Sequence, residues 1–407
     1  MERAILHCDL NSFFASVEEV RNPELRAYPV AVCGNPKHRH GIILAKNEKA
    51  KAFGVKTAET LWQARRKCPE LVLVPPHHEE YSKYSKIVND IYLRYTDLVE
   101  PFGIDESWLD VTGSTHLFGT PREIADDIRK TVFEETGLTV SVGVSFTKSF
   151  AKLGSDYKKP DATTEITREN FREIVWPLPV SDLLFVGRSS REVFSRLGIE
   201  TIGDLARASR EMISIHLGKT GELVHDYANG IDTSPVQSAF EETSPKSIGR
   251  GLTFAHDLTD VSEIKTALLA LSDDVAQRLR KHGMRASAVS VTVRDPSFKT
   301  TSRQKTLSSP THLSSEIADG CLELYMKYYS KSAAPVRMLT VTALSLIDES
   351  LSSASQLSLF GEEEVSKKRE SVELTLDKIR KKFGPKSTTS ASLLNGDFSI
   401  PKKGEKW

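Results

Sequence analysis

Three acidic residues that lie far apart in the chain constrain its fold most strongly. Asp9 ends the apolar run of residues 4–8, and Asp105 and Glu106 are adjacent within residues 99–112. Carboxylates at strand ends with no Lys or Arg beside them in the sequence repel one another unless a cation neutralises them. Hard oxygen ligands suit Mg²⁺, and pairs of such ions promote in-line phosphoryl or nucleotidyl transfer. The pattern indicates a two-ion magnesium site, against the alternative of unrelated surface acids at turns.

The adjacent pair also predicts a local geometry. In a regular strand, the side chains of Asp105 and Glu106 point to opposite faces of the sheet. Both residues can serve one site only if a hairpin tip at residues 103–105 breaks this alternation.

Length and composition describe a multidomain chain without membrane or secretion features. Its 407 residues predict roughly two to four domains. No run approaches the roughly 20 apolar residues of a membrane span, and the N-terminus has no signal-peptide pattern. The four cysteines have no paired spacing, which predicts neither disulfides nor a zinc site. We expect a cytosolic, monomeric protein.

The formal net charge of zero hides a basic segment. Between residues 278 and 305, eight basic residues stand against one acid, Asp295. A local field of this density is typical of a surface that binds a phosphate backbone, and the alternative is an ordinary solvated face. The eight are Arg278, Arg280, Lys281, Arg285, Arg294, Lys299, Arg303 and Lys305.

The order of predicted elements indicates an α+β multidomain fold. Strand, helix, hairpin, helix and strand form a split β-α-β layer of the ferredoxin-like kind over residues 1–10 and 77–168, with residues 11–76 inserted. Residues 169–240 contain short helix-turn units with Gly at the turns and no convincing strand. Mixed α/β structure returns over 244–347, and residues 348–407 form a linker and a tail with one helix near 366–383.

Four motifs occur in the order seen in Y-family DNA polymerases, and they most resemble the bacterial DNA polymerase IV branch. They lie at residues 7–18, 50–55, 104–111 and 148–160. The resemblance implies a right-hand polymerase with a palm (1–10 and 77–168), small fingers (11–76), a helical, helix-hairpin-helix-like thumb (169–240) and a little finger (244–347). It also implies that Asp9, Asp105 and Glu106 are catalytic and hold two Mg²⁺, with the backbone carbonyl of Leu10 completing a metal shell.

The resemblance assigns the substrate-binding residues as well. Phe14 matches the steric gate, which excludes ribonucleotides by overlap with the 2′-hydroxyl, and Phe13 is its packing or stacking neighbour. Lys159 matches a lysine that meets the incoming triphosphate. The fingers depart from the family pattern, because Glu48 and Lys51 stand where many members carry Tyr and Arg. We expect Lys51 to compensate at lower nucleotide affinity, although it lacks the Arg fork.

Two further groups of residues are expected to bind macromolecules. The first is a DNA-binding set in the little finger: Arg250, Arg294, Lys299, Arg303 and Lys305. The second resembles the sliding-clamp-binding peptide of bacterial replication proteins, an extended anchor on a tether: Gln356, Leu357, Leu359 and Phe360.

The implied function is a template-directed DNA polymerase of the translesion type with low fidelity. Its partners would be primer-template DNA, deoxynucleoside triphosphates and the sliding clamp. One alternative is a non-catalytic adaptor bound to clamp and DNA, but such relatives typically lack the metal carboxylates. A metal-dependent nuclease shares the carboxylates but does not explain Phe14 or the clamp peptide.

Overall fold

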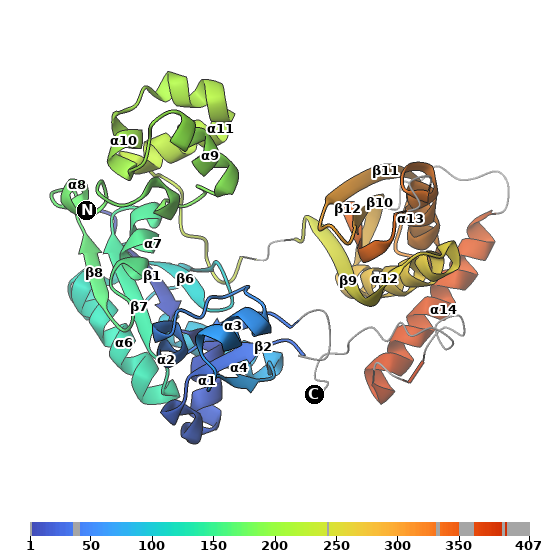
Figure 1. Cartoon of the computed structure of the whole chain (residues 1–407), viewed down its shortest axis with the longest axis horizontal. Helices are drawn as coiled ribbons and strands as arrows, with labels where there is room; N and C mark the ends of the chain where they lie inside the picture. The colour runs from blue at the N-terminus through green and yellow to red at the C-terminus, as the bar shows by residue number, and fades with distance from the viewer. Residues whose placement is uncertain are drawn as a thin grey trace. The chain divides into compact units, whose positions relative to one another are not determined.

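The computed structural model describes residues 2–35, 41–241, 244–330, 334–349, 362–384 and 387–388. These residues form two compact units, one up to residue 241 and the other from residue 244 onward. Figure 1 shows the elements of each unit. Within the described residues, no helix is both long enough and apolar enough to cross a membrane.

A five-stranded sheet forms the centre of the first unit, in the order β5-β6-β1-β7-β8. Its strands are β1 (Ile5–Leu10), β5 (Val99–Pro101), β6 (Glu106–Asp110), β7 (Val140–Ser145) and β8 (Thr163–Ile166). The strand β1 is central and pairs antiparallel with both β6 and β7. The strand order and the two helical crossovers, α4 (His78–Tyr92) and α6 (Pro121–Thr136), agree with the predicted split β-α-β layer.

Helices cover both faces of this sheet. The buried faces of α1 (Phe13–Arg21), α4 (His78–Tyr92) and α6 (Pro121–Thr136) share one apolar core with β1, β6 and β7. The helix α7 (Lys148–Tyr157) packs closely on β7 and β1. Short elements connect these parts: η1 (Pro23–Ala27), η2 (Thr112–Ser114) and α5 (Thr115–Phe118).

Two glycines let α7 approach the sheet closely. A Cβ added at Gly143 of β7 would lie 1.9 Å from the Ala151 carbonyl oxygen and 2.5 Å from the Ser155 nitrogen. A Cβ added at Gly154 of α7 would lie 2.9 Å from the Cα of Gly143. Since backbone atoms cannot rotate away as side chains do, the spacing between β7 and α7 depends on both glycines.

The inserted segment forms a small three-stranded sheet in the order β3-β2-β4. Its elements are β2 (Val30–Cys33), β3 (Ile43–Lys46), α2 (Glu48–Ala52), α3 (Leu61–Lys67) and β4 (Val72–Val74). This sheet has an apolar core of its own, and Ala31 is the first residue along the chain that belongs to it. By contrast, Phe13, Ala15 and Val17 of α1 belong to the core of the five-stranded sheet. The boundary predicted at residue 11 therefore falls before a helix that packs on the larger sheet.

Residues 167–241 of the first unit are helical, as predicted. The elements are α8 (Phe171–Ile174), η3 (Val180–Asp182), α9 (Arg188–Arg196), α10 (Ile202–Arg207) and α11 (Arg210–Ala228). Positive φ angles at Gly198 and Gly218 mark the two predicted glycine turns, the second as a kink within α11. The core of this part includes Phe146 and Phe150, so it packs directly on the end of the five-stranded sheet.

The second unit is a four-stranded antiparallel sheet, in the order β11-β10-β12-β9, with two helices packed on one face. Its elements are β9 (Ser247–Leu258), α12 (Val261–Lys281), β10 (Met284–Arg294), β11 (Thr300–Thr311), α13 (Ser314–Tyr328) and β12 (Val336–Asp348). The strands extend beyond the ranges that the apolar alternation predicted, because the polar residues at their ends still pair with neighbouring strands.

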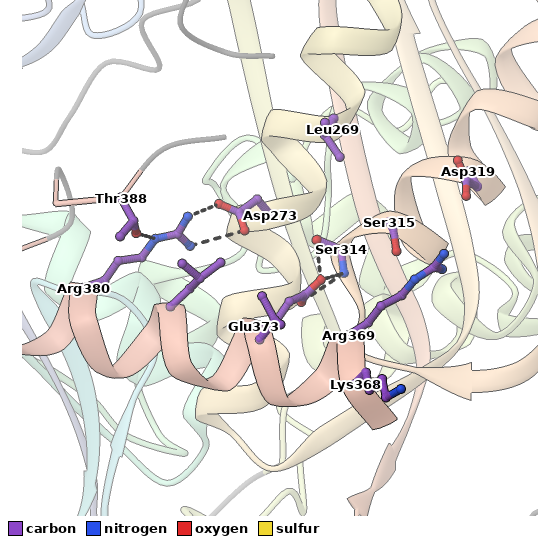
Figure 2. Close-up of a pocket in the computed structure, with 12 residues that line it drawn as sticks. Leu269, Asp273, Ser314, Ser315, Asp319, Lys368, Arg369, Glu373, Arg380 and Thr388 are labelled. Carbon is purple, nitrogen blue, oxygen red and sulfur yellow. Dashed lines mark hydrogen bonds and ion pairs between the residues drawn. The ribbon is translucent and has the colours of Figure 1, made fainter. Parts of the chain in front are cut away.

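The C-terminal helix α14 (Glu362–Phe383) docks on α12 and α13 of this unit through charged side chains. Arg280 of α12 pairs with Glu373 and Asp377 of α14, and its side chain is only 3% exposed. Glu373 also accepts hydrogen bonds from the backbone nitrogen and the hydroxyl of Ser314, at the start of α13. Figure 2 shows Glu373 beside Ser314, and Arg380 beside Asp273 of α12.

Candidate active site

The register of β1 and β6 brings the three predicted carboxylates to one end of the five-stranded sheet. Asp9 of β1 lies directly opposite Glu106, the first residue of β6. Asp105 is in the turn before β6, and its carbonyl accepts a hydrogen bond of 2.9 Å from the nitrogen of Leu10. The turn breaks the strand alternation between Asp105 and Glu106, as the sequence required. A Cβ at Gly103 would lie 3.3 Å from Asp105 Oδ1 and 3.2 Å from Glu106 Cγ, so the turn passes close to both acids.

Two lysine side chains reach these carboxylates from α7 and the residues just after it. The Lys152 Nζ lies 2.5 Å from Glu106 Oε2 and 3.5 Å from Asp9 Oδ2. The Lys159 Nζ lies 2.8 Å from Asp9 Oδ1. Asp156 pairs with both lysines, at 3.4 and 2.7 Å. The acids thus have no basic neighbours in the sequence, but the fold supplies two cations.

The charges in this cluster shift its protonation equilibria in different directions. Burial opposes ionisation of Glu106, but contacts from His7 and Lys152 outweigh it and lower the pKa of Glu106 to about 2. Burial, with the negative charges of Asp9 and Glu106, raises the pKa of Asp105. The crowded carboxylates therefore still repel one another despite the lysines, which favours binding of a further cation.

A buried histidine of β1 lies beside the carboxylates. His7 Nδ1 lies 2.8 Å from the hydroxyl of Ser155, and its Nε2 lies 3.4 Å from Glu106 Oε2. Burial lowers the pKa of His7. The ring therefore lies beside the Glu106 carboxylate from within the core.

The predicted steric gate has a structured neighbourhood. The Phe14 ring is half-buried and stacks on Tyr81, with ring centroids 4.1 Å apart and an interplanar angle of 11°. The Tyr81 hydroxyl donates a 2.6 Å hydrogen bond to Glu18, which also contacts His77 at 2.8 Å. Phe13 is buried in the core, so the structure gives it a packing role.

Glu48 and Lys51 of α2, which we expected to stand where many family members carry Tyr and Arg, pair with each other. The Glu48 carboxylate lies 3.3 Å from the Lys51 Nζ and accepts a 3.3 Å hydrogen bond from Ser12. Lys46 donates to Thr57 at 3.2 Å, and burial together with the charge of Lys51 lowers the pKa of Lys46. The two lysines therefore lie close enough to repel each other.

The predicted DNA-binding residues of the second unit lie at different places on its sheet. Arg294 belongs to the face that lacks helices, and Lys299 is exposed in the β10–β11 turn. Arg303 stacks over Tyr328, and Lys305 pairs with Glu323 at 2.5 Å, both on α13. Arg250 lies 3.4 Å from Asp274 of α12.

Two other members of the basic segment, Arg280 and Arg285, are engaged in the docking of α14. Arg278, Arg280 and Lys281 are on α12 rather than on or between strands. Arg280 and Arg285 pair with acids of α14. The basic segment is therefore not one continuous surface.

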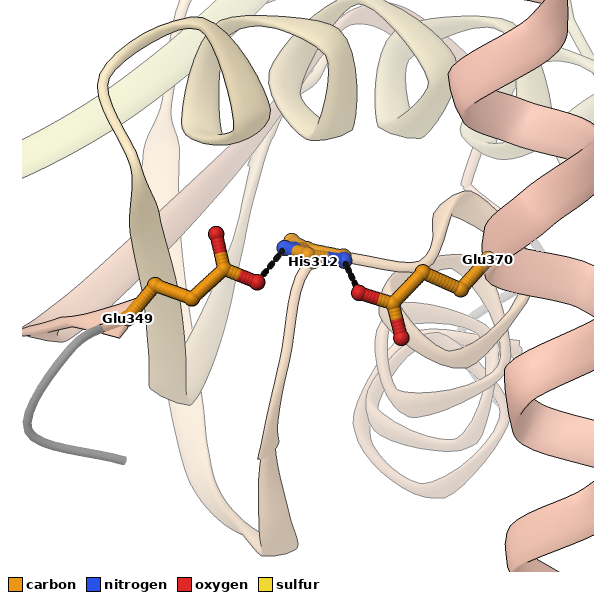
Figure 3. Close-up of side chains that lie close together, drawn as sticks. All are labelled: His312, Glu349 and Glu370. Carbon is orange, nitrogen blue, oxygen red and sulfur yellow. Dashed lines mark ion pairs between the residues drawn. The ribbon is translucent and has the colours of Figure 1, made fainter. Parts of the chain in front are cut away.

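A second acidic cluster, in the second unit, also has metal-ligand residue types. His312 lies between Glu349 and Glu370, 3.8 Å from the first and 2.9 Å from the second (Figure 3). One guanidinium nitrogen of Arg285 lies 2.9 Å from Glu349 and 2.7 Å from Glu370. Since Arg285 already pairs with both carboxylates and Glu370 belongs to α14, we assign this cluster to the docking of α14.

Two residues near the site carry little signal in the sequence. Lys152 is one of many lysines, and only its place in the motif at 148–160 marks it. In the sequence, Tyr81 has the pattern of an ordinary apolar position of α4, and only the structure shows its ring against Phe14.

The clamp-peptide residues Gln356, Leu357, Leu359 and Phe360 lie outside the described residues.

Comparisons with known proteins identify the family. The chain matches the impB/mucB/samB family over residues 8–156 and the C-terminal domain of that family over residues 245–359. It is 46% identical to DNA polymerase IV of Acetivibrio thermocellus, covering 97% of this chain and 98% of that one. It is also 36% identical to DNA polymerase IV 1 of Bacillus subtilis, covering 98% and 95%. The chain belongs to the Y-family DNA polymerases, in the DNA polymerase IV branch.

A solved structure supports the fold of this Y-family member. A Y-family DNA polymerase chimera of Dbh and Dpo4 matches with a TM-score of 0.75 at 24% identity, covering 84% of this chain and 99% of the chimera. The mixed α/β fold with palm, fingers, thumb and little finger is thereby confirmed. The relatives named DNA polymerase IV show that the chain is a template-directed DNA polymerase of the translesion type, and members of its family use divalent metal ions.

Proposed function

We propose that Asp9, Asp105 and Glu106 hold two Mg²⁺ ions for nucleotidyl transfer, with the carbonyl of Leu10 as a further ligand. The observation that carries this proposal is the pairing of Asp9 with Glu106 across β1 and β6, beside Asp105 in the turn. Carboxylate oxygens are hard ligands that fit Mg²⁺. When bound, two such ions lower the pKa of the primer 3′-hydroxyl and stabilise the attacking and leaving oxygens.

The lysines have a complementary part in this proposal. Lys159 pairs with Asp9, and Lys152 pairs with both Asp9 and Glu106. A triphosphate bound beside the carboxylates offers these ammonium groups an alternative anion of higher charge. We infer that Lys159 moves from Asp9 to the triphosphate, whereas Lys152 stays and holds Glu106 ionised.

Primer extension with Mg²⁺ and all four deoxynucleotides tests the assignment of the carboxylates. Glu106→Gln should abolish extension, whereas Asp110→Asn, at the opposite end of the same strand, should retain it. Normal extension by the Glu106→Gln enzyme would exclude the metal role. An inactive wild-type protein that still binds DNA would favour the non-catalytic adaptor.

Phe14 is proposed as the steric gate, with Tyr81 stacked behind it. A ring fixed by stacking cannot yield to a 2′-hydroxyl, so ribonucleotides are refused by overlap. Phe14→Ala should raise the kcat/KM for ribonucleotides and leave that for deoxynucleotides less affected. Equal discrimination by the variant and the wild type would refute this role.

Lys51, with Lys46, is proposed to bind the triphosphate in place of the family's arginine. Because Lys51 also pairs with Glu48, only part of its charge acts on the nucleotide. We therefore expect a lower affinity for the triphosphate than a bidentate arginine would give. Lys51→Ala should raise the KM for nucleotide, and Glu48→Gln should lower it. An unchanged KM in Lys51→Ala would rule out the contact.

In the little finger, Arg294 and Lys299 are proposed as the main DNA contacts of the predicted set, because neither one pairs with a helix. Arg250, Arg303 and Lys305 would contribute to DNA binding only after leaving their partners on α12 and α13. Arg294→Ala should therefore reduce the salt dependence of DNA binding more than Arg250→Ala does.

The sliding clamp is proposed as a partner through residues 356–360. A tethered peptide raises the local concentration of the enzyme at the primer end without new DNA contacts. Deleting residues 356–360 should abolish clamp-stimulated synthesis and leave distributive synthesis intact, and loss of both would contradict the proposal. Low fidelity, a monomeric state and a cytosolic location remain predictions.

A further inference from the structure

The outward face of α3 in the fingers presents an exposed tryptophan between basic residues. Leu61 and Ala64 turn inward against the core of the small sheet. Trp62 is on the opposite side and is 66% exposed, a large value for the biggest apolar side chain. Arg65 and Arg66 are exposed on the same side of the helix.

The charges of the two arginines are not neutralised by carboxylates of the described residues. The Arg66 guanidinium lies over the Trp62 ring, 4.9 Å from the ring centroid. Neither Arg65 nor Arg66 forms an ion pair with a carboxylate of the described residues. By comparison, Lys67 pairs with Glu59 at 2.5 Å.

The surrounding charge also favours an anionic partner. Residues 41–74 carry seven Lys or Arg against three Glu and no Asp. A protein-docking patch needs a contiguous apolar surface, but the exposed residues of α3 other than Trp62 are polar or charged. An aromatic ring with a guanidinium beside it instead matches the way bases stack and phosphates are neutralised in single-stranded nucleic acid.

We propose that Trp62, Arg65 and Arg66 form a binding platform for single-stranded DNA, namely the unpaired template ahead of the primer end. A base stacks on the free side of the Trp62 ring, and the two arginines neutralise the flanking phosphates. The choice of the template strand rests on the proposed polymerase function, whereas the affinity for single strands does not. Stacking on a ring reads no sequence, so the platform is indifferent to base identity.

Equilibrium binding of the full chain to two primer-templates tests the platform. One template ends at the templating base, and the other continues as a long 5′ overhang. Trp62→Ala should weaken binding of the long overhang by about 5- to 150-fold, the equivalent of one base stack, and leave binding of the short template unchanged. Trp62→Phe should restore most of the loss, because a smaller ring still stacks.

The matched control is Tyr28→Ala, which removes another exposed aromatic ring, 53% exposed, from the fingers. It should bind both templates as the wild type does. Arg65→Met with Arg66→Met should lower the slope of log K against log salt on the long overhang alone. The expected decrease is about 0.7 for each phosphate that the variant no longer neutralises.

Two outcomes overturn the platform. The first is a Trp62→Ala variant that binds the long overhang as tightly as the wild type does. The exposed face of α3 would then serve another class of partner. The other is an equal loss on both templates, which marks a general structural defect. Primer extension on the short template is measured in parallel. If no variant and no wild-type protein extends it, the polymerase function fails, while an overhang-dependent loss in Trp62→Ala still supports the platform.

Discussion

The docking of α14 gives a prediction whose size follows from the structure. Arg280 Nε and Nη2 lie 2.7 and 3.2 Å from the two Asp377 oxygens, and Nη1 contacts Glu373 and donates to the His312 carbonyl at 2.9 Å. Replacing Arg280 with Met keeps the bulk and leaves two largely buried carboxylates without their cation. We therefore expect α14 to detach far more often in Arg280→Met.

The expected loss of docking free energy in Arg280→Met lies between two limits. Breaking a buried ion pair by removing one partner costs about 3–5 kcal/mol, and exposed pairs contribute at most about 1 kcal/mol. Glu373 keeps its hydrogen bonds to Ser314, and Asp377 keeps a contact with Arg380 at 4.0 Å. These remaining contacts place the expected loss at about 2–3 kcal/mol, or about 30- to 150-fold in the docking equilibrium.

Hydrogen exchange of the α14 amides measures this equilibrium directly, because local opening need not follow global unfolding. A double-mutant cycle of Arg280→Met with Glu373→Gln separates the pair from the loss of either side chain. Lys368→Met, an exposed α14 substitution, is the control and should leave protection unchanged. A coupling energy below about 0.5 kcal/mol would place this pair among ordinary surface pairs and refute the reasoning.

Three shorter predictions follow from packing and charge. Gly143→Ala should lower the melting temperature strongly, because its Cβ would meet backbone atoms of α7 at 1.9 and 2.5 Å, and an unchanged melting temperature would contradict the close approach. Since the pKa of Glu106 is depressed from 4.5 to about 2, its stabilising effect is present above pH 4.5 and is lost as the pH falls toward 2. The difference in urea midpoint between wild type and Lys152→Met should narrow over that range, and a constant difference would argue against the pairing. All four cysteines are buried, and burial raises the pKa of Cys33 to about 11 and that of Cys321 to about 12. A thiol reagent should label the protein only in denaturant, and rapid labelling of the native protein would contradict this burial.

The convergence of the three carboxylates was predictable because it depends on local patterns. Asp9 ends an apolar run, and Gly103 precedes Asp105 and Glu106 at a point where only a turn lets both acids face one site. These constraints need no knowledge of distant packing. The strand pairing that joins them is short and antiparallel, so one register satisfies both apolar faces.

The lysines of the site were less predictable because their position depends on how closely α7 packs. Lys152 reaches Glu106 only because α7 lies against β7, and this spacing requires Gly143 and Gly154 together. The spacing of apolar residues in a sequence does not predict the distance between the backbones of a helix and a strand. The two glycines were the available signal, since each stands inside a regular element where it otherwise destabilises.

The little finger illustrates a different limit. Alternation predicts that residues of a strand lie on two faces, but it does not tell which face the helices cover. The register places Arg303 opposite Val291 and Lys305 opposite Val289, both core residues on the helix side. Arg294 pairs with Thr300 on the other face. A basic segment counted along the sequence therefore divides between two surfaces.

The charge of the site links the two proposed ligands of the polymerase. Among the described residues, the four carboxylates of Asp9, Asp105, Glu106 and Asp156 interact with two ammonium groups, those of Lys152 and Lys159. With all groups ionised, the cluster has an excess of two negative charges, so a triphosphate alone is repelled. Two divalent cations reverse that excess and make the same place attractive to a triphosphate. We infer that metal and nucleotide bind with positive coupling.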